Sequence, residues 1–280
     1  MDHRLISTIL ALLLSLSQAH HLVDLDREGS DSPLTSIQIE DPEDVDITTN
    51  ILQSNNGSSE MLMEGDLVVS NTRNAIKCRN NRCLWRKSSN GLVEVPYTMS
   101  SRFSRYQKKR IENAMKTFNT ETCIRFVPRS HQRDFISIKS RDGCYSYLGR
   151  TGGKQVLSLA KYGCVYHGII QHELNHALGF YHEHTRSDRD QYVKINWENV
   201  APRTIFNFKK QNTNNLNTPY EYTSIMHYGR TAFSTNRQDT ITPIPDPNKS
   251  IGQRSNLSRG DIFRINKLYS CSEYRYFNKP

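Results

Sequence analysis

The sequence feature that most limits what this chain can be is an eleven-residue stretch that starts at His172 and reads H-E-x-x-H-x-x-G-x-x-H. Positions four residues apart share one face of an α-helix, so His172 and His176 can present two imidazoles to one ion. Glu173 lies beside the first histidine, where its carboxylate can reach a water molecule on that ion without being a ligand. Gly179 tolerates positive φ and can turn the chain so that His182 returns as a third ligand. Three nitrogen donors and one open position are typical of catalytic zinc, here one ion per domain.

A second element follows at Ser224-Ile225-Met226-His227-Tyr228. A methionine usually fills a core, but Met226 follows an extended zinc motif, and this combination predicts the turn found beneath the metal in metzincins. The two elements together predict a zinc-dependent endopeptidase. A matrix-binding protein with a structural or inactive zinc site is the alternative. The intact Glu173 and the missing fourth protein ligand argue against it.

The chain changes character at Arg73. Residues 1–73 contain 3 basic and 13 acidic residues, a formal charge of −10, and the other residues contain 34 basic and 15 acidic residues, a charge of +19. A basic domain suggests an acidic partner, such as an anionic matrix or the chain's own acidic leader, the part up to Arg73. No nucleic-acid-binding motif is present, so we expect no nucleic-acid partner.

Residues 1–19 have the features of a secretory signal, with a short apolar run and a small-x-small cleavage site. The run is too short to span a bilayer, so we expect no membrane anchor. Residues 20–73 are acidic and polar, and taken alone they look disordered. They end at Arg73, a cleavage site for a trypsin-like protease. We therefore expect a propeptide over 20–73 and a mature domain over 74–280, with storage in secretory granules and then secretion.

All six cysteines lie after Arg73, and an even number in an exported chain favours disulfides over thiol-ligated zinc. The residues alone leave the pairing open. Three N-x-S/T sequons mark possible glycan sites at Asn56, Asn248 and Asn256.

Hydrophobic periodicity predicts an α+β fold with two lobes around a central helix. Its N-terminal lobe combines a sheet with two helices, and roughly 75 residues without regular periodicity precede a terminal helix in the other lobe. The predicted elements are helices over 104–119 and 166–180, strands over 124–127, 135–138 and 156–159, and a helix from Ser258, where Ser258 and Asp261 form a possible capping box.

Over residues 74–280 the chain resembles the astacin family. The match continues past the third histidine, where residues 182–190 fit the family's H-E-x-x-R-x-D-R-D, and it includes the Ser-x-Met-His-Tyr turn. The resemblance implies the two-lobed astacin-like metzincin domain with a twisted sheet. It also implies that Glu173 is the general base and acid, and that zinc is bound by His172, His176 and His182.

The same resemblance implies roles for three further residues. Tyr228 is similar to the tyrosine that touches the metal site at rest and swings to stabilise the oxyanion. Glu183 is similar to the residue that pairs with the buried mature N-terminus. Astacin propeptides carry an inhibitory motif, F-x-G-D, and Met63-Glu64-Gly65-Asp66 matches its Gly and Asp with Met in place of Phe. Asp66 would then occupy the open zinc position in the zymogen only, and an ordinary acidic turn is the alternative.

Disulfides are also implied by the resemblance. The family's two bridges correspond to Cys144–Cys164 and Cys123–Cys271. Cys78 and Cys83 would form a further, local pair.

Within the family, the chain is most similar to the six-cysteine fish hatching enzymes, the choriolysins. The segments at residues 74–78, 171–176, 215–220 and 241–245 carry this likeness. It implies protein substrates, and specifically egg-envelope glycoproteins, with the leader as inhibitor. An astacin of another tissue that acts on general extracellular proteins is the alternative. We expect a monomer.

Arg230, just beyond the turn at Met226, is a candidate substrate-pocket residue, with an ordinary surface arginine as the alternative.

Overall fold

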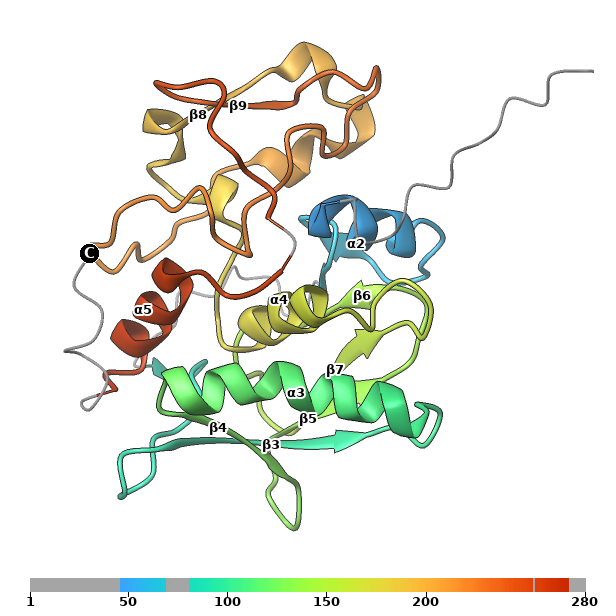
Figure 1. Ribbon diagram of the computed structural model, residues 1–280, viewed down its shortest axis with the longest axis vertical. Coiled ribbons are helices and arrows are strands. Elements are labelled where there is room, and N and C mark those ends of the chain that lie inside the picture. The colour runs from blue at the N-terminus through green and yellow to red at the C-terminus, as the bar shows by residue number, and fades with distance from the viewer. Residues whose placement is uncertain (1–45, 69–80, 254, 272–280) are drawn as a thin grey trace, which may run out of the picture. The chain divides into compact units, whose positions relative to one another are not determined.

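The N-terminal lobe is built on a five-stranded sheet with the strand order β4-β3-β5-β7-β6 (Figure 1). The computed structural model describes residues 46–68, 81–253 and 255–271. Strands β4, β3, β5 and β7 are parallel, and β6 is antiparallel to β7. In chain order the strands are β3 Val93–Met99, β4 Ile124–Pro128, β5 Phe135–Lys139, β6 Cys144–Tyr145 and β7 Lys154–Leu159. The three predicted strands are therefore confirmed, and β3 and β6 are additional.

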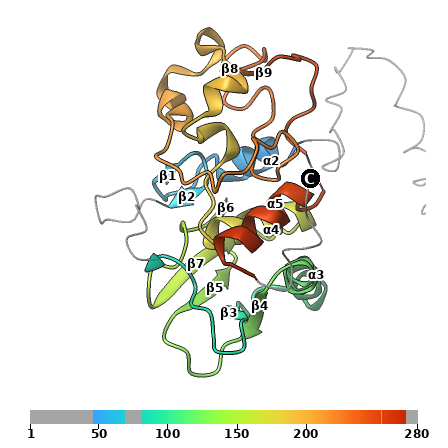
Figure 2. The same cartoon turned by 90° about the vertical axis from the view of Figure 1, so that its left-hand side faces the viewer.

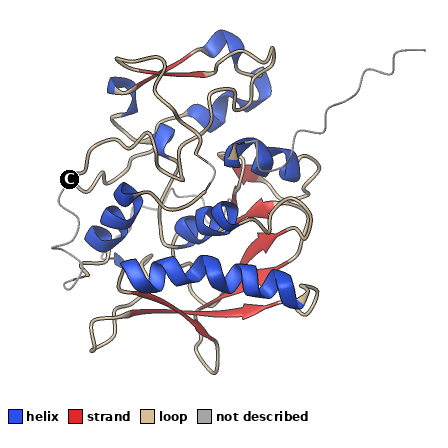
Figure 3. Cartoon of the chain, viewed as in Figure 1, coloured by secondary structure: helices blue, strands red, loops and turns tan. Residues whose placement is uncertain are grey.

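Two helices complete this lobe. Helix α3, Arg105–Glu121, starts at a capping box of Ser104 and Gln107 and buries its apolar face at Ile111, Ala114, Met115 and Phe118. Helix α4, His167–Ala177, is buried on all sides from its second residue onward, because it lies between the lobes (Figure 3). It is shorter than the predicted 166–180, since the helix gives way to a turn at Gly179, whose φ is +108°.

The C-terminal lobe is irregular, as expected. It contains the two-stranded pair β8 and β9, several 3-10 helices and the terminal helix α5 (Figure 2). The capping box predicted at Ser258 and Asp261 is present at the start of α5. In chain order the elements are η2 Glu183–Thr185, η3 Arg189–Gln191, β8 Val193–Ile195, η4 Trp197–Asn199, η5 Pro202–Phe208, β9 Ile241–Pro243 and α5 Arg259–Leu268.

The acidic leader is folded over residues 46–68, which corrects the expectation of disorder for this part. It forms helix α2, Ile47–Asn55, and the strands β1, Leu62–Met63, and β2, Leu67–Val68. Ile47 and Ile51 are 4% and 1% exposed and belong to the same apolar cluster as the core of the N-terminal lobe. The Asn55 side chain donates to the carbonyls of Gly65 and Cys144, at 2.7 Å each. Tertiary packing therefore stabilises a segment whose own composition does not predict structure.

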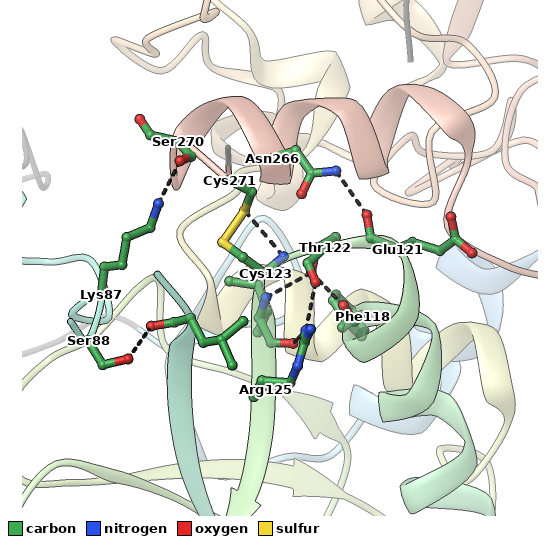
Figure 4. The surroundings of a disulfide bond; sticks show 12 residues. Lys87, Ser88, Phe118, Glu121, Thr122, Cys123, Arg125, Asn266, Ser270 and Cys271 are labelled. Atoms are coloured by element: carbon green, nitrogen blue, oxygen red, sulfur yellow. Dashed lines mark hydrogen bonds between the residues drawn. A yellow bond between two sulfur atoms is a disulfide. The ribbon is translucent and has the colours of Figure 1, made fainter. Parts of the chain in front are cut away.

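Disulfides join distant parts of the chain. Cys123–Cys271 ties the start of β4 to the end of α5 (Figure 4), and Cys144–Cys164 ties β6 to the loop before α4. Both pairings confirm the prediction. Cys83 is also disulfide-bonded, and its expected partner Cys78 lies outside the described residues, as do the signal segment and Arg73. Within the described part of the chain, no helix has the length and apolar content needed to cross a bilayer.

Candidate metal centre and active site

Three histidines converge at the C-terminal half of α4. His172 and His176 lie one turn apart on the same face of the helix, and the turn at Gly179 brings His182 back beside them. All three side chains are 0–1% exposed. The ring centroids of His176 and His182 are 4.7 Å apart, as are those of His172 and His176. The arrangement predicted from the spacing of the motif is therefore the one that the structure contains.

The hydrogen bonds of the three rings determine which nitrogen faces the centre. His172 Nδ1 donates to the Ile225 carbonyl at 2.8 Å, and His176 Nδ1 donates to the Phe180 carbonyl at 2.7 Å. His182 Nδ1 donates to Glu64 Oε2 at 2.8 Å. A carbonyl or carboxylate can only accept, so each Nδ1 carries the proton. In a neutral imidazole the Nε2 atom is then a lone-pair donor to a metal.

The three Nε2 atoms have the mutual spacing expected of ligands around one shared cation. His172 Nε2 is 3.1 Å from His176 Nε2 and 3.2 Å from His182 Nε2. Three neutral imidazoles that face one another with their lone pairs repel, and a cation bound to all three Nε2 atoms would relieve this repulsion. Donors around a tetrahedral zinc at about 2.05 Å lie about 3.3 Å apart. The observed spacing fits zinc closely.

Asp66 closes the fourth side of this centre. Its Oδ2 atom is 3.0 Å from His172 Nε2 and 3.3 Å from His182 Nε2, and its Oδ1 atom is 3.2 Å from His176 Nε2. The four ligand atoms lie within 4.8 Å of one another, and all four residues are buried. Burial alone would raise the pKa of Asp66, but the positive charge of His182, together with hydrogen bonds from the His172 and His176 rings, holds that pKa well below its ordinary value. The carboxylate is therefore an anion that faces the metal site.

The electrostatics of the histidines differ because their neighbours differ. Burial lowers the pKa of His176 to about 4, although Asp66 acts in the opposite direction. Burial also lowers the pKa of His182, but Asp66 and Glu64 outweigh it and raise the pKa to about 9. His182 is thus the ring most strongly coupled to the two leader carboxylates.

Glu173 is fully buried next to the centre. Neither carboxylate oxygen has a hydrogen-bond partner among the described residues. Burial, followed by the charge of Asp66, raises the pKa of Glu173 well above its ordinary value. A buried carboxylate without a partner is costly in free energy. Its placement fits a group that exchanges protons with a molecule bound at the metal.

The turn at Met226 is connected to the histidine segment through hydrogen bonds to its backbone carbonyls. Met226 is buried, and its carbonyl accepts a hydrogen bond from the Glu183 N–H at 2.9 Å, directly after the third histidine. Asp261, at the start of α5, accepts from the N–H of Ile225 at 2.9 Å. The Ile225 carbonyl in turn accepts the hydrogen bond from His172 Nδ1. Helix α5 thus helps to fix the orientation of a ligand ring.

Tyr228 packs against the same centre. Its ring is stacked on His184 with a centroid distance of 3.7 Å and lies 4.7 Å from the centroid of His182. Its hydroxyl donates to the Glu64 carbonyl. The leader therefore holds the hydroxyl group that is expected to serve the oxyanion.

Glu183 and Arg230 are both engaged within the chain. Glu183 is buried and accepts from Arg264 at 2.6 and 2.8 Å and from Arg186 at 3.2 Å. Its expected partner, the mature N-terminus at Asn74, lies outside the described residues. Arg230 donates to Asp239 at 3.0 Å and to two backbone carbonyls of the 247–249 segment. A specificity role for Arg230 stays a prediction, and its guanidinium is occupied by intramolecular bonds.

Glu64 is a site residue that sequence reasoning did not single out. It lies in the segment 63–66, which matches part of the inhibitory motif of astacin propeptides, is 0% exposed and contacts His182 directly. Its position in the motif corresponds to the variable x. A charged side chain between Met63 and Gly65 was the available signal, but no local pattern connects it to a histidine 118 residues away.

The fold and the three-histidine centre define a zinc metalloendopeptidase of the metzincin type. Residues 79–270 match the model of the Astacin peptidase family. The chain belongs to the astacin family, as the resemblance implied, and the predicted fold class and zinc cofactor are confirmed.

Fish enzymes are among its most similar relatives. High choriolytic enzyme 1 of Oryzias latipes is 57% identical over 266 residues, which cover 95% of this chain and 98% of that protein. Low choriolytic enzyme of the same fish is 52% identical over 267 residues, covering 95% and 97%. A solved structure described as High choriolytic enzyme 1, a hatching enzyme zinc-protease from Oryzias latipes, matches with 62% identity and a TM-score of 0.68. It covers 71% of this chain and 100% of that chain.

Proposed function

We propose that this protein is a secreted zymogen of a hatching enzyme that digests egg-envelope proteins. Residues 1–19 would direct export, residues 20–73 would inhibit, and residues 74–280 would be the mature enzyme after a trypsin-like protease cuts at Arg73. The observation that carries the zymogen proposal is Asp66, which lies at 3.0–3.3 Å from all three zinc-facing nitrogens. A leader residue in that position excludes a substrate carbonyl and a water molecule.

Proton transfer would be the task of Glu173. Zinc held by the three histidines supplies a Lewis acid that lowers the pKa of water and polarises a peptide carbonyl. Once Asp66 has left, Glu173 can accept the proton of the attacking water and deliver it to the leaving amine.

Tyr228 would stabilise the transition state. In the uncut chain its hydroxyl is held by the Glu64 carbonyl. Departure of the leader frees this hydroxyl to donate a hydrogen bond to the tetrahedral oxyanion, beside the His182 ring. The same event therefore opens the metal site and releases an oxyanion donor.

The egg envelope is the proposed substrate because the relatives that align along almost the whole chain are choriolytic enzymes. The formal charge of +19 after Arg73 also suits an acidic or anionic matrix. We propose secretion on the same basis, together with the signal-like residues 1–19. The mature enzyme would act as a monomer.

The test uses protein that has been cut at Arg73 and separated from residues 20–73, and it compares the action of this protein on isolated fish egg envelopes and on casein. We expect soluble peptides from the envelopes, blocked by a zinc chelator and reduced by orders of magnitude in Glu173→Gln, which should still bind zinc. Casein cleavage with intact envelopes would reject the hatching role and favour an astacin of another tissue. Near-normal cleavage by Glu173→Gln would reject the assigned general base.

A further inference from the structure

Each zinc-facing histidine has a partner for its outer nitrogen, and one of the three partners comes from the leader. His172 and His176 donate to backbone carbonyls of the catalytic domain, at Ile225 and Phe180. His182 donates instead to Glu64 Oε2, at 2.8 Å. When the leader leaves, the first two rings keep their acceptors and only His182 loses its own.

Glu64 is held in place at both ends. Its carboxylate also accepts from the His182 backbone N–H at 3.3 Å, and its carbonyl accepts from the Tyr228 hydroxyl. Its φ is +51°, a left-handed conformation that is unfavourable for a residue with a side chain. Such a conformation persists where the surroundings fix it. In this conformation the Glu64 carboxylate contacts His182 and the Glu64 carbonyl accepts from the Tyr228 hydroxyl.

The burial of Glu64 indicates that its charge faces a positive partner. The residue is 0% exposed, and its Oε1 atom has no hydrogen-bond partner among the described residues. A buried carboxylate with an unsatisfied oxygen is destabilising unless a nearby positive charge compensates it. The positive charge that can compensate it lies at His182, either on the protonated ring or on a cation bound at its Nε2 atom.

We propose that Glu64 is a positioning residue for zinc in the uncut chain, so that the leader increases zinc affinity as well as blocking the fourth coordination position. A carboxylate that accepts the outer proton of a ligand histidine fixes its tautomer and orientation and makes it a stronger donor. Loss of such a partner typically weakens metal binding by about 10- to 100-fold. The inference rests on the proposed zymogen and adds a second function to its leader, retention of the metal until activation.

The experiment measures zinc dissociation constants by competition with a chromophoric chelator. The protein is the uncut chain carrying Glu173→Gln, which prevents self-cleavage. Glu64→Ala should bind zinc about 10- to 100-fold more weakly than this parent. Glu64→Gln retains an acceptor oxygen without the charge and should show a smaller loss. Glu60→Ala is the matched control, because it removes a leader carboxylate that pairs with Arg141 at 3.0 Å on the surface, and it should leave zinc affinity unchanged.

Cobalt substitution separates the two leader carboxylates. The visible spectrum of bound Co²⁺ should change in Asp66→Asn, which removes a ligand, and should keep the parent pattern in Glu64→Gln. The affinity loss of Glu64→Ala should persist when Asp66→Asn is already present. Zinc affinity within twofold of the parent, or a loss that disappears in the Asp66→Asn background, would overturn the proposal.

Failure of the underlying zymogen hypothesis gives a different result. If the leader does not inhibit, a chain that keeps Glu173 and has Arg73 replaced, so that it stays uncut, cleaves peptides as fast as the cut enzyme. That comparison does not involve the zinc dissociation constants.

Discussion

Gly65→Ala should weaken the inhibition of the uncut chain, because Gly65 shapes the latch segment, residues 63–66. Its φ is +83°, and an added Cβ would lie 2.4 Å from Leu52 Cδ2 and 3.1 Å from Phe233 Cζ. The left-handed conformation costs about 1–2 kcal/mol for a residue with a side chain. Forcing a methyl group into packed side chains typically costs about 1–3 kcal/mol. We take about 2–3 kcal/mol as the total, since Leu52 can move.

Such a change is large enough to be measured as enzyme activity. At about 1.36 kcal/mol per factor of ten, it increases the fraction of undocked leader by about 30- to 150-fold. The assay is the cleavage rate of a fluorogenic peptide by chain in which Arg73 is replaced and the leader stays attached. The rate is compared with that of the parent and of the cut enzyme.

Gly57→Ala provides the matched control. Gly57 also lies in the leader with a positive φ, +104°, but an added Cβ would have no neighbour within 4 Å. It therefore carries the backbone cost without the contact, and its effect should be clearly smaller. If Gly65→Ala shows no more activity than Gly57→Ala, the clash of the added Cβ with Leu52 does not loosen the latch segment, and the reasoning is refuted.

Two further predictions concern stability. The Cys123–Cys271 disulfide spans a sequence separation of 148 and the second described disulfide spans 20. Loop entropy then predicts that their removal lowers the free energy of unfolding by about 5 and about 3 kcal/mol, and urea denaturation should give the larger loss for the longer loop. The pKa of Asp134 is lowered first by the Gly153 N–H and also by Arg150. Its stabilisation is therefore present above the ordinary value near pH 3.8 and is lost as the pH falls through the lowered pKa. Asp134→Asn should make the melting temperature depend less on pH in this acid range. An unchanged pH dependence would contradict the assignment.

The zinc centre was predictable because its information is local. The spacing of His172, His176 and His182 around Gly179 specifies a helix and a turn, and the structure contains both. Helix α3 was predictable for the same reason, since its apolar residues recur at helical spacing. The predicted disulfides came from the family pattern and not from the residues alone.

What was missed depends on contacts between distant residues. Helix α2 is stabilised by Ile47 and Ile51, which belong to the main apolar cluster, and the helix packs against α4 and β6. Strand β3 contains Pro96, which argues against a central strand. The pairing of β3 with β5 begins only at Tyr97, so the missing N–H of Pro96 breaks no bond on that side. Glu183 pairs with Arg264, which lies 81 residues further along the chain, and no sequence periodicity indicates this ion pair.

The burial of the leader has a consequence for the timing of activity. Ile47, Ile51 and Leu67 are each at most 4% exposed, so the leader is part of the core and not a loosely attached strand. A cut at Arg73 would break one peptide bond and leave these contacts in place. The cut protein would then be a tight complex of enzyme and peptide, and activity would begin when the peptide dissociates. Dilution favours dissociation. The cut protein would therefore stay inactive while it is stored at high concentration and would become active as it spreads into a larger volume.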